Sequence, residues 1–204
     1  MQSLIVRAVI ELGVETTIVS EDTRGGRLAS DILTYASKYG YIRTPDGWFV
    51  PIRDLLHRME DVAEFLHVRT LQSDGEFELG GGFEILTGGG QSLGLPRSAL
   101  FPLAMLMADT LINLRDEDDV QSVFVSNQDI WDMSLRASEV KIETRQIAAR
   151  EHQVYWLPHK ELAEHLMQAR LEVNDFAMRL EPLLLGYRDI QLTPKIIRQM
   201  FGLQ

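Results

Sequence analysis

The chain has 204 residues, a formal net charge of −10, 45% apolar and 25% charged residues, and no cysteine. Its length allows one generous domain or two small lobes with a real core. The lack of cysteine excludes disulfides, thiolate zinc sites and cysteine nucleophiles, and it is typical of a reducing compartment, so we expect a cytoplasmic protein. The negative charge argues against a broad basic surface for nucleic acid. No apolar run approaches the roughly 18 residues of a membrane span, so no membrane contact is expected.

The first part of the chain predicts two helices that flank a hairpin. Residues 3–12 are almost continuously apolar, a pattern that does not separate a buried helix from a buried strand. The β-branched, threonine-rich residues 14–19 predict a strand. Residues 28–39 and 55–66 repeat apolar positions at helical spacing, and Gly40 is a suitable C-cap for the first of these helices.

A tight hairpin is predicted between these two helices. In Pro45-Asp46-Gly47, proline restricts φ at the first corner, aspartate can bond to its own backbone, and glycine accepts positive φ. Tyr41-Ile42 and Trp48-Phe49-Val50 have the aromatic and β-branched content of two paired strands. Helix, hairpin and helix within residues 1–70 is the layout of a small winged-helix module. A hairpin that covers an ordinary α+β core is the equal alternative.

The middle of the chain is rich in glycine and in short strand patterns. Strands are predicted at residues 77–79, 83–86, 120–126, 140–144 and 154–157, and helices at residues 99–114 and 128–135. The glycine triplets at residues 80–82 and 88–90 lack the Lys-Ser/Thr that follows the glycines of a P-loop. We interpret them as tight turns on either side of a short strand.

The last part of the chain predicts a helical extension. An apolar stripe follows Pro158, Gly186 ends that helix, and Thr193-Pro194 begins a short final one. Packing on the chain's own core is one explanation for so many apolar residues, and docking of another subunit is the other. The candidate interface residues are Phe176, Leu180, Leu184, Ile197 and Phe201.

Several motifs occur in an order that resembles the RNA 2′-phosphotransferase family (the KptA type). The matching positions are Gly40-Tyr41-Ile42, Gly47-Trp48-Phe49, Ile52, Leu55-Leu56, Glu76 to Leu79, Ile85 to Ser92, Val123 to Ser126 and Val154 to Trp156. Proteins of this family join a winged-helix lobe to an ADP-ribosyltransferase-like lobe, and they use NAD to remove an internal 2′-phosphate from RNA. The resemblance implies an α+β fold with a winged-helix-like N-terminal lobe (1–70), an ADP-ribosyltransferase-like mixed β lobe (71–158) and a helical C-terminal extension (159–204).

The charged residues of the family's motifs are missing from this chain. The motif arginine falls on Leu86 and the motif histidine on Gln91, and the family's His-Gly-Thr falls near residues 100–102, which contain no histidine. The Arg-His pair of the first-lobe helix has no counterpart around residues 35–38. Without these groups a phosphate and a pyrophosphate lack charge-assisted partners.

We therefore expect no catalytic residues and no cofactor, and we interpret the chain as a non-catalytic binding or assembly protein. One alternative is an active NAD-dependent RNA 2′-phosphotransferase or ADP-ribosyltransferase that uses other residues. Another is a structural subunit of a large assembly, for example a viral one. The expected partners are protein subunits or further copies of the chain.

RNA or DNA is the other partner class, and it would bind at the hairpin and the helix that follows. The candidate residues are Arg43, Trp48, Arg53 and Arg58. Three acidic residues of the same helix, Glu60, Asp61 and Glu64, dilute this basic patch, so an ordinary charged helix face is the alternative explanation.

Two further patterns bear on catalytic and metal sites. Residues 90–94 fit Gly-x-Ser-x-Gly, with Ser92 as the nucleophile and Asp132 and His152 following in the right order. A nucleophile elbow needs a helix directly after the serine, which Pro96 prevents, so we interpret the pattern as a glycine-rich turn. The five histidines lack His-Glu-x-x-His spacing, and no metal site is expected.

Overall fold

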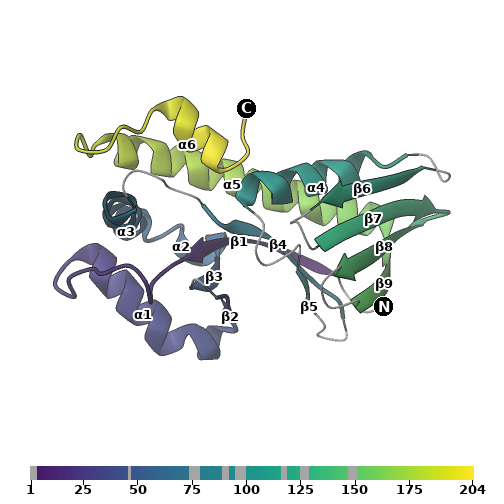
Figure 1. Ribbon diagram of the computed structural model, residues 1–204, viewed down its shortest axis with the longest axis horizontal. Helices are drawn as coiled ribbons and strands as arrows, with labels where there is room; N and C mark the ends of the chain where they lie inside the picture. Colours follow the sequence, from purple (N-terminus) through teal and green to yellow (C-terminus); the bar gives the residue numbers. More distant parts are fainter. Residues whose placement is uncertain are drawn as a thin grey trace.

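The computed structural model describes residues 4–45, 47–73, 79–88, 92–94, 100–115, 119–124, 129–146 and 151–204. Over these residues the chain is an α+β protein with two antiparallel sheets and six helices (Figure 1). The strands are β1 (Ile5–Leu12), β2 (Ile42–Arg43), β3 (Trp48–Pro51), β4 (Gly81–Leu86), β5 (Ser92–Gly94), β6 (Val120–Phe124), β7 (Asp129–Arg136), β8 (Glu139–Gln146) and β9 (Glu151–Pro158). The helices are α1 (Arg24–Tyr39), α2 (Ile52–Leu55), α3 (Met59–Gln72), α4 (Phe101–Asn113), α5 (His159–Leu185) and α6 (Pro194–Met200).

The first sheet, here called the central sheet, has the strand order β2-β3-β1-β4-β5. Strand β1 lies in its middle, where Ile10 pairs with Val50 of β3 and Arg7 pairs with Glu84 of β4. Val6, Ala8, Ile10 and Leu12 are buried on one face of β1, and Val9 is the only residue of the strand buried on the other, where Ile5 is exposed. Strand β1 belongs to the expected first lobe (1–70) and β4 to the expected second lobe (71–158), so the central sheet contains strands of both.

The second sheet, here called the meander sheet, joins β6, β7, β8 and β9 in sequence order. The helix predicted at residues 128–135 is wrong, because this segment forms β7, with β6 on one side and β8 on the other. Trp131, Met133 and Leu135 are buried at alternate positions, which is the period of a strand. Every described strand pair is antiparallel, so no parallel pair of the mixed β lobe expected for residues 71–158 occurs among the described strands.

The predicted hairpin and first helix are confirmed. Thr23 caps the start of α1, its side chain accepting from the Gly26 amide at 3.0 Å, and Gly40 ends the helix with φ of 68°. Strands β2 and β3 pair as expected. A side chain at Gly47 would collide with the carbonyl of Leu12, so the hairpin depends on this glycine. The helix predicted at residues 55–66 is divided into α2 and α3.

The strand predicted at residues 14–19 is wrong. The chain turns here instead, and the amides of Thr16 and Thr17 both donate to the carbonyl of Gly13, at 3.2 and 2.9 Å. The first glycine triplet also differs from its prediction as a turn, since Gly81 and Gly82 lie inside β4. A side chain at Gly81 would collide with the ring of Phe101, so the triplet allows α4 to approach the sheet closely. The second triplet extends beyond the described residues, as do residues 77, 78, 91, 125 and 126.

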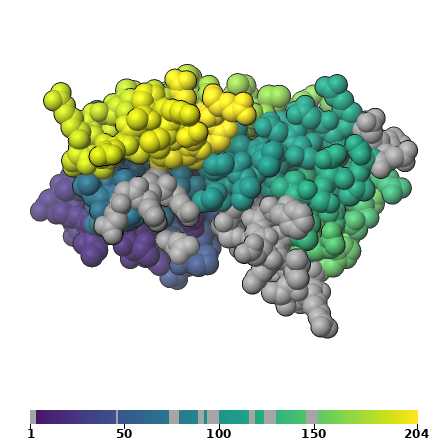
Figure 2. Space-filling view, turned by 45° about the horizontal axis from the view of Figure 1, so that its top comes forward, coloured from purple at the N-terminus to yellow at the C-terminus, as the bar shows by residue number. Residues whose placement is uncertain are grey.

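Helix α5 runs along both sheets and joins them through one hydrophobic core (Figure 1). The predicted interface residues Phe176, Leu180, Leu184, Ile197 and Phe201 are all buried in this core. The Phe201 ring makes edge-on contacts with Phe176 and Phe101, with centroids 5.8 and 5.7 Å apart. The yellow C-terminal residues lie directly against teal α4 in the space-filling view (Figure 2). These five residues therefore pack inside the chain, and any docking surface consists of other side chains.

No helix in the described part of the chain is long and apolar enough to cross a bilayer.

Candidate functional site

A cleft between α1, β3 and α2 brings together aromatic and charged side chains. Its volume is about 470 Å³. The lining residues are Leu28, Asp31, Ile32, Tyr35, Tyr39, Tyr41, Val50, Arg53, Asp54, Leu55, His57 and Arg58. We call this hollow the tyrosine cleft. It contains two of the predicted nucleic-acid-binding residues, Arg53 and Arg58.

One face of α1 supplies the aromatic wall of the cleft. Asp31, Tyr35 and Tyr39 follow one another at spacings of four residues and so lie in a row along the helix. The rings of Tyr35 and Tyr39 are 6.1 Å apart, and Tyr39 is 5.8 Å from Tyr41. The Lys38 ammonium lies 5.8 and 5.6 Å from the centroids of Tyr35 and Tyr39. These exposed rings are therefore positioned to attract a cation.

Tyr41 and Asp54 form a polar pair at the cleft. Burial, together with the charge and hydrogen bond of Asp54, raises the pKa of Tyr41 to about 12. The neutral hydroxyl thus donates to the carboxylate throughout the physiological pH range. Asp54 is half-buried and belongs to α2, so this bond ties Tyr41, two residues after the end of α1, to the helix on the other side of the cleft.

Arg58 links three segments of the chain. Its Nη1 donates to Asp31 of α1 at 2.7 Å, and its Nε donates to Asp61 of α3 at 2.9 Å. Burial opposes the charged guanidinium, but the hydrogen bonds that it donates to Asp61 and Asp31 outweigh this effect and raise the pKa of Arg58 above its ordinary value. The guanidinium is thus committed to carboxylates of its own chain.

Arg53 is also paired within the chain. Its Nη2 donates to Oε1 of Glu172 on α5 at 2.9 Å. The other oxygen, Oε2 of Glu172, is buried with no hydrogen-bond partner among the described residues. Arg53, His57 and Arg58 do meet in one cleft, as a site for anions would require. However, both guanidinium groups are neutralised by carboxylates, so the cleft lacks an uncommitted arginine.

The other two predicted nucleic-acid residues lie at the hairpin and do not line this cleft. Arg43 donates to Oε2 of Glu15 at 2.9 Å, and the Trp48 indole donates to Oε1 of the same carboxylate at 3.3 Å. The Arg43 guanidinium also lies 5.9 Å from the Trp48 ring centroid. The structure thus separates the four predicted residues into two pairs, and each arginine has an acidic partner.

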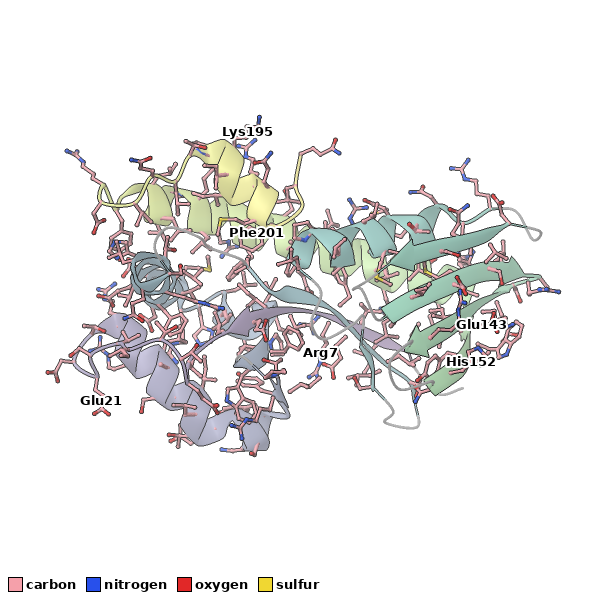
Figure 3. The ribbon with its side chains drawn as sticks, in the orientation of Figure 1. Arg7, Glu21, Glu143, His152, Lys195 and Phe201 are labelled. Carbon is pink, nitrogen blue, oxygen red and sulfur yellow. The ribbon has the colours of Figure 1, made fainter. Side chains whose placement is uncertain are left out.

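The candidate serine triad is not assembled. Ser92 donates to Glu84 of the central sheet at 3.2 Å, whereas Asp132 and His152 belong to the meander sheet. Asp132 is paired with Arg145, and His152 lies 3.5 Å from Glu143 (Figure 3). The Lys141 ammonium holds the pKa of Glu143 below its ordinary value. Within the described part of the chain, no three histidine or carboxylate side chains are grouped as metal ligands.

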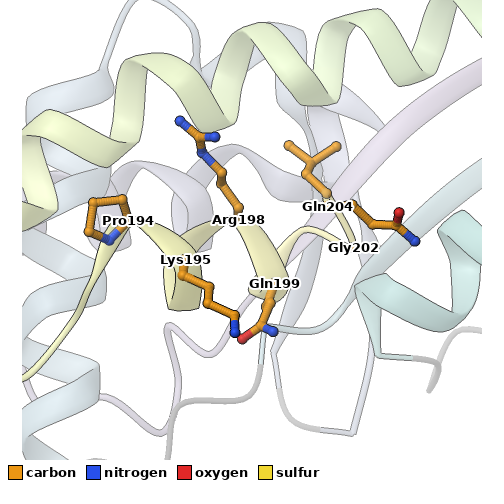
Figure 4. Close-up of a pocket in the computed structure, with 7 residues that line it drawn as sticks. Pro194, Lys195, Arg198, Gln199, Gly202 and Gln204 are labelled. Carbon is orange, nitrogen blue, oxygen red and sulfur yellow. The ribbon is translucent and has the colours of Figure 1, made fainter.

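A second hollow, of about 630 Å³, lies beside α6. Its lining residues are Pro194, Lys195, Arg198, Gln199, Gly202, Leu203 and Gln204 (Figure 4). They come from one short segment, and Arg198 donates to Glu181 of α5 at 3.1 Å. The tyrosine cleft is the stronger candidate because separate elements bring different chemical groups together there.

The tyrosine wall was missed by reasoning from the sequence, although a local signal was present. Tyr35, Tyr39 and Tyr41 are three of the five tyrosines of the chain and occur within seven residues. Their apolar character was interpreted as part of a helix face and a strand. The signal that identifies them as a site is their exposure next to Asp31 and Asp54, which depends on how α1 and α2 pack.

Comparison of the chain with models of protein families, with curated proteins and with solved structures found no match.

Proposed function

We propose that this chain is a non-catalytic protein-binding module whose tyrosine cleft takes a basic segment of a partner protein. The observation that carries the proposal is the composition of the cleft. Three tyrosines and two carboxylates, Asp31 and Asp54, surround it, while its arginines are paired within the chain.

A lysine or arginine side chain suits this lining in two ways. Tyrosine faces attract cations, and Lys38 already lies within 6 Å of two of these rings. A carboxylate has about four acceptor positions, so Asp31 and Asp54 keep acceptor capacity beyond Arg58 and Tyr41. Tyrosine also contributes a large contact area at low cost in side-chain entropy, which favours its use at binding surfaces.

Charge favours a basic protein segment over nucleic acid. The net charge of −10 repels a phosphate backbone at long range and attracts a cationic partner. Binding to nucleic acid depends on Lys and Arg that neutralise phosphates. The arginines at the cleft and the hairpin would first have to leave Glu15, Glu172, Asp31 and Asp61.

A scaffold similar to that of the RNA 2′-phosphotransferases is part of this proposal. It rests on the shared order of motifs, with a winged-helix-like first lobe and an ADP-ribosyltransferase-like second lobe. Two positions that are charged in the family are apolar here. One is Leu86, and the other falls near Phe101, which is fully buried. Such a scaffold would hold a partner and would leave it chemically unchanged.

The test uses two labelled peptides and one polynucleotide. One peptide consists of lysine, arginine and tryptophan, the other has glutamate in place of each cation, and the polynucleotide is single-stranded polyuridylate. Fluorescence anisotropy should show binding of the basic peptide alone. Tyr39→Ala and Asp54→Asn should each weaken it about five- to tenfold, since a cation–aromatic or charged contact contributes about 1 kcal/mol.

Trp156→Ala is the matched control for general attraction to an acidic protein. Trp156 is an exposed aromatic residue on β9 with Lys141 over its ring, and it does not line the cleft. Equal losses in all three variants, or preference for the acidic peptide or polyuridylate, would contradict the proposal. Transfer of phosphate from 2′-phosphorylated RNA in the presence of NAD would establish the enzymatic alternative instead.

A further inference from the structure

Helix α5 has a second apolar stripe on its solvent side, separate from the stripe that it buries in the core. Its apolar members are Met167, Leu171, Met178 and Leu185, which are 45%, 57%, 57% and 37% exposed. Half-buried Asn174 lies between them. At about 100° per residue, these five side chains fall within about 60° around the helix axis. We call this set the outer seam of α5.

The outer seam has the spacing of a coiled coil. Leu171, Met178 and Leu185 recur every seven residues, and Met167 and Asn174 precede the first two of them by four residues. These are the a and d positions of a heptad repeat, through which one helix packs against another. One further d position, Glu181, is occupied by a carboxylate that accepts from Arg198 of α6. The continuous seam therefore extends from Met167 to Met178, with Leu185 beyond it.

We propose that the outer seam pairs with the same seam of a second copy of this chain, with the two α5 helices parallel. In this arrangement Asn174 faces Asn174 of the partner subunit, so each amide can donate to the other. In an antiparallel pair, where a positions face d positions, Asn174 faces the partner's Leu171. Its side-chain amide then has no amide opposite it. A polar residue at one seam position specifies register and orientation in this way.

Charges beside the seam favour the parallel pair as well. Arg170 occupies a g position, and Asp175, five residues later, occupies an e position. In a parallel pair these positions meet between helices, so Arg170 lies near the partner's Asp175, and the two-fold axis repeats the contact. Within the chain Arg170 is paired with Asp109 and Asp175 with Arg179. Each group can add a second partner from the other helix, because a guanidinium has five N–H donors and a carboxylate about four acceptor positions.

The seam is short, but it belongs to a helix that is already folded. A free helix of this length would have to form as it dimerised, whereas α5 is held by its buried face on the core of the chain. Association then orders only a few side chains, so less conformational entropy is lost when the dimer forms. The exposed methionines adapt their shape to a partner, since their side chains are flexible.

The absence of cysteine from the natural chain allows a direct test of orientation. Leu171→Cys should form disulfide-linked dimers under mild oxidation, because parallel helices place this position next to its own copy. His165→Cys, at an exposed position of α5 outside the seam, is the matched control and should form no disulfide-linked dimer. A mixture of Met167→Cys and Met178→Cys chains that links only as the hetero-pair would show an antiparallel arrangement and would overturn the proposal.

Light scattering of the cysteine-free chain, from micromolar to millimolar concentration, tests association independently. Leu171→Glu should raise the dimer dissociation constant at least tenfold, while Leu33→Glu, an exposed leucine of α1, should leave it unchanged. Asn174→Leu should strengthen association and weaken the preference for one orientation. A wild-type chain that stays monomeric throughout, or equal effects of the two glutamate variants, would overturn the proposal.

Discussion

Arg7 of β1 and Glu84 of β4 form an ion pair across the central sheet. The Nε of Arg7 donates to Oε2 of Glu84 at 2.9 Å, and Ser92 of β5 donates to Oε1 at 3.2 Å. Glu84 is only 4% exposed. Three neighbouring strands are therefore joined by one buried carboxylate, and Arg7 lies at the centre of the molecule (Figure 3).

Removing one member of this pair should destabilise the fold strongly. Arg7→Ala leaves Glu84 buried without its cation, and we expect a loss of about 2–4 kcal/mol in the free energy of unfolding. The double variant Arg7→Met, Glu84→Leu should lose much less, because no charge remains buried. Urea unfolding measures both changes. Arg43→Ala, which removes the exposed pair with Glu15, is the control and should change stability by less than about 1 kcal/mol.

Phe201 should contribute to stability as a core residue. It is fully buried between Phe101 and Phe176, so Phe201→Ala creates a cavity and should lower the free energy of unfolding by about 3–5 kcal/mol. Ile196→Ala on the exposed side of α6 should lower it by less than about 1 kcal/mol. Similar small losses in both variants would show that the last helix does not pack as described.

Gly81 should not tolerate a side chain, because its Cβ would meet both the Phe101 ring and the carbonyl oxygen of Val9. Its Cβ would collide with the Phe101 ring, and we expect Gly81→Ala to lower stability by about 2–3 kcal/mol. Gly40→Ala tests the alternative cause, backbone strain, because Gly40 has φ of 68° and open space around it, and it should lose about 1 kcal/mol. In a double-mutant cycle, Gly81→Ala with Phe101→Leu should lose less than the sum of the single variants. Additive losses would exclude the collision.

The raised pKa of Tyr41 predicts an alkaline loss of stability. An unfolded tyrosine ionises near pH 10, whereas folded Tyr41 ionises near pH 12. Between these values the unfolded chain binds fewer protons than the folded chain, so the stabilisation by Tyr41 is complete below about pH 10 and falls as pH rises toward 12. Urea unfolding of wild type and Tyr41→Phe should therefore differ in slope over this pH range.

A second measurement assigns the cause of that shift. Asp54→Asn removes the negative charge and the hydrogen-bonded carboxylate beside the Tyr41 hydroxyl. The phenolate absorbance step that Tyr41→Phe abolishes should then move to lower pH, though burial should keep it above the ordinary tyrosine value. An unchanged step would show that burial alone sets the pKa.

Features encoded by neighbouring residues were predictable from the sequence. The glycine that ends α1, the apolar stripe of α5 and the Thr-Pro start of α6 each depend on a few consecutive residues. Their physical cause is local, since it lies in backbone freedom, capping and helical spacing. The α+β class follows from the same signals.

Other features depend on which surfaces meet, and a local pattern does not carry that information. Residues 5–12 became a central strand because β3 and β4 flank it, and residues 129–136 became a strand because β6 and β8 pair with it. Phe201 is buried because α6 folds back against α4 and α5. The tyrosine cleft arises in the same way. Arg58 reaches Asp31, 27 residues away, only because the packing of α1 and α3 brings them together, and the resulting ion pair commits the guanidinium to a carboxylate of its own chain.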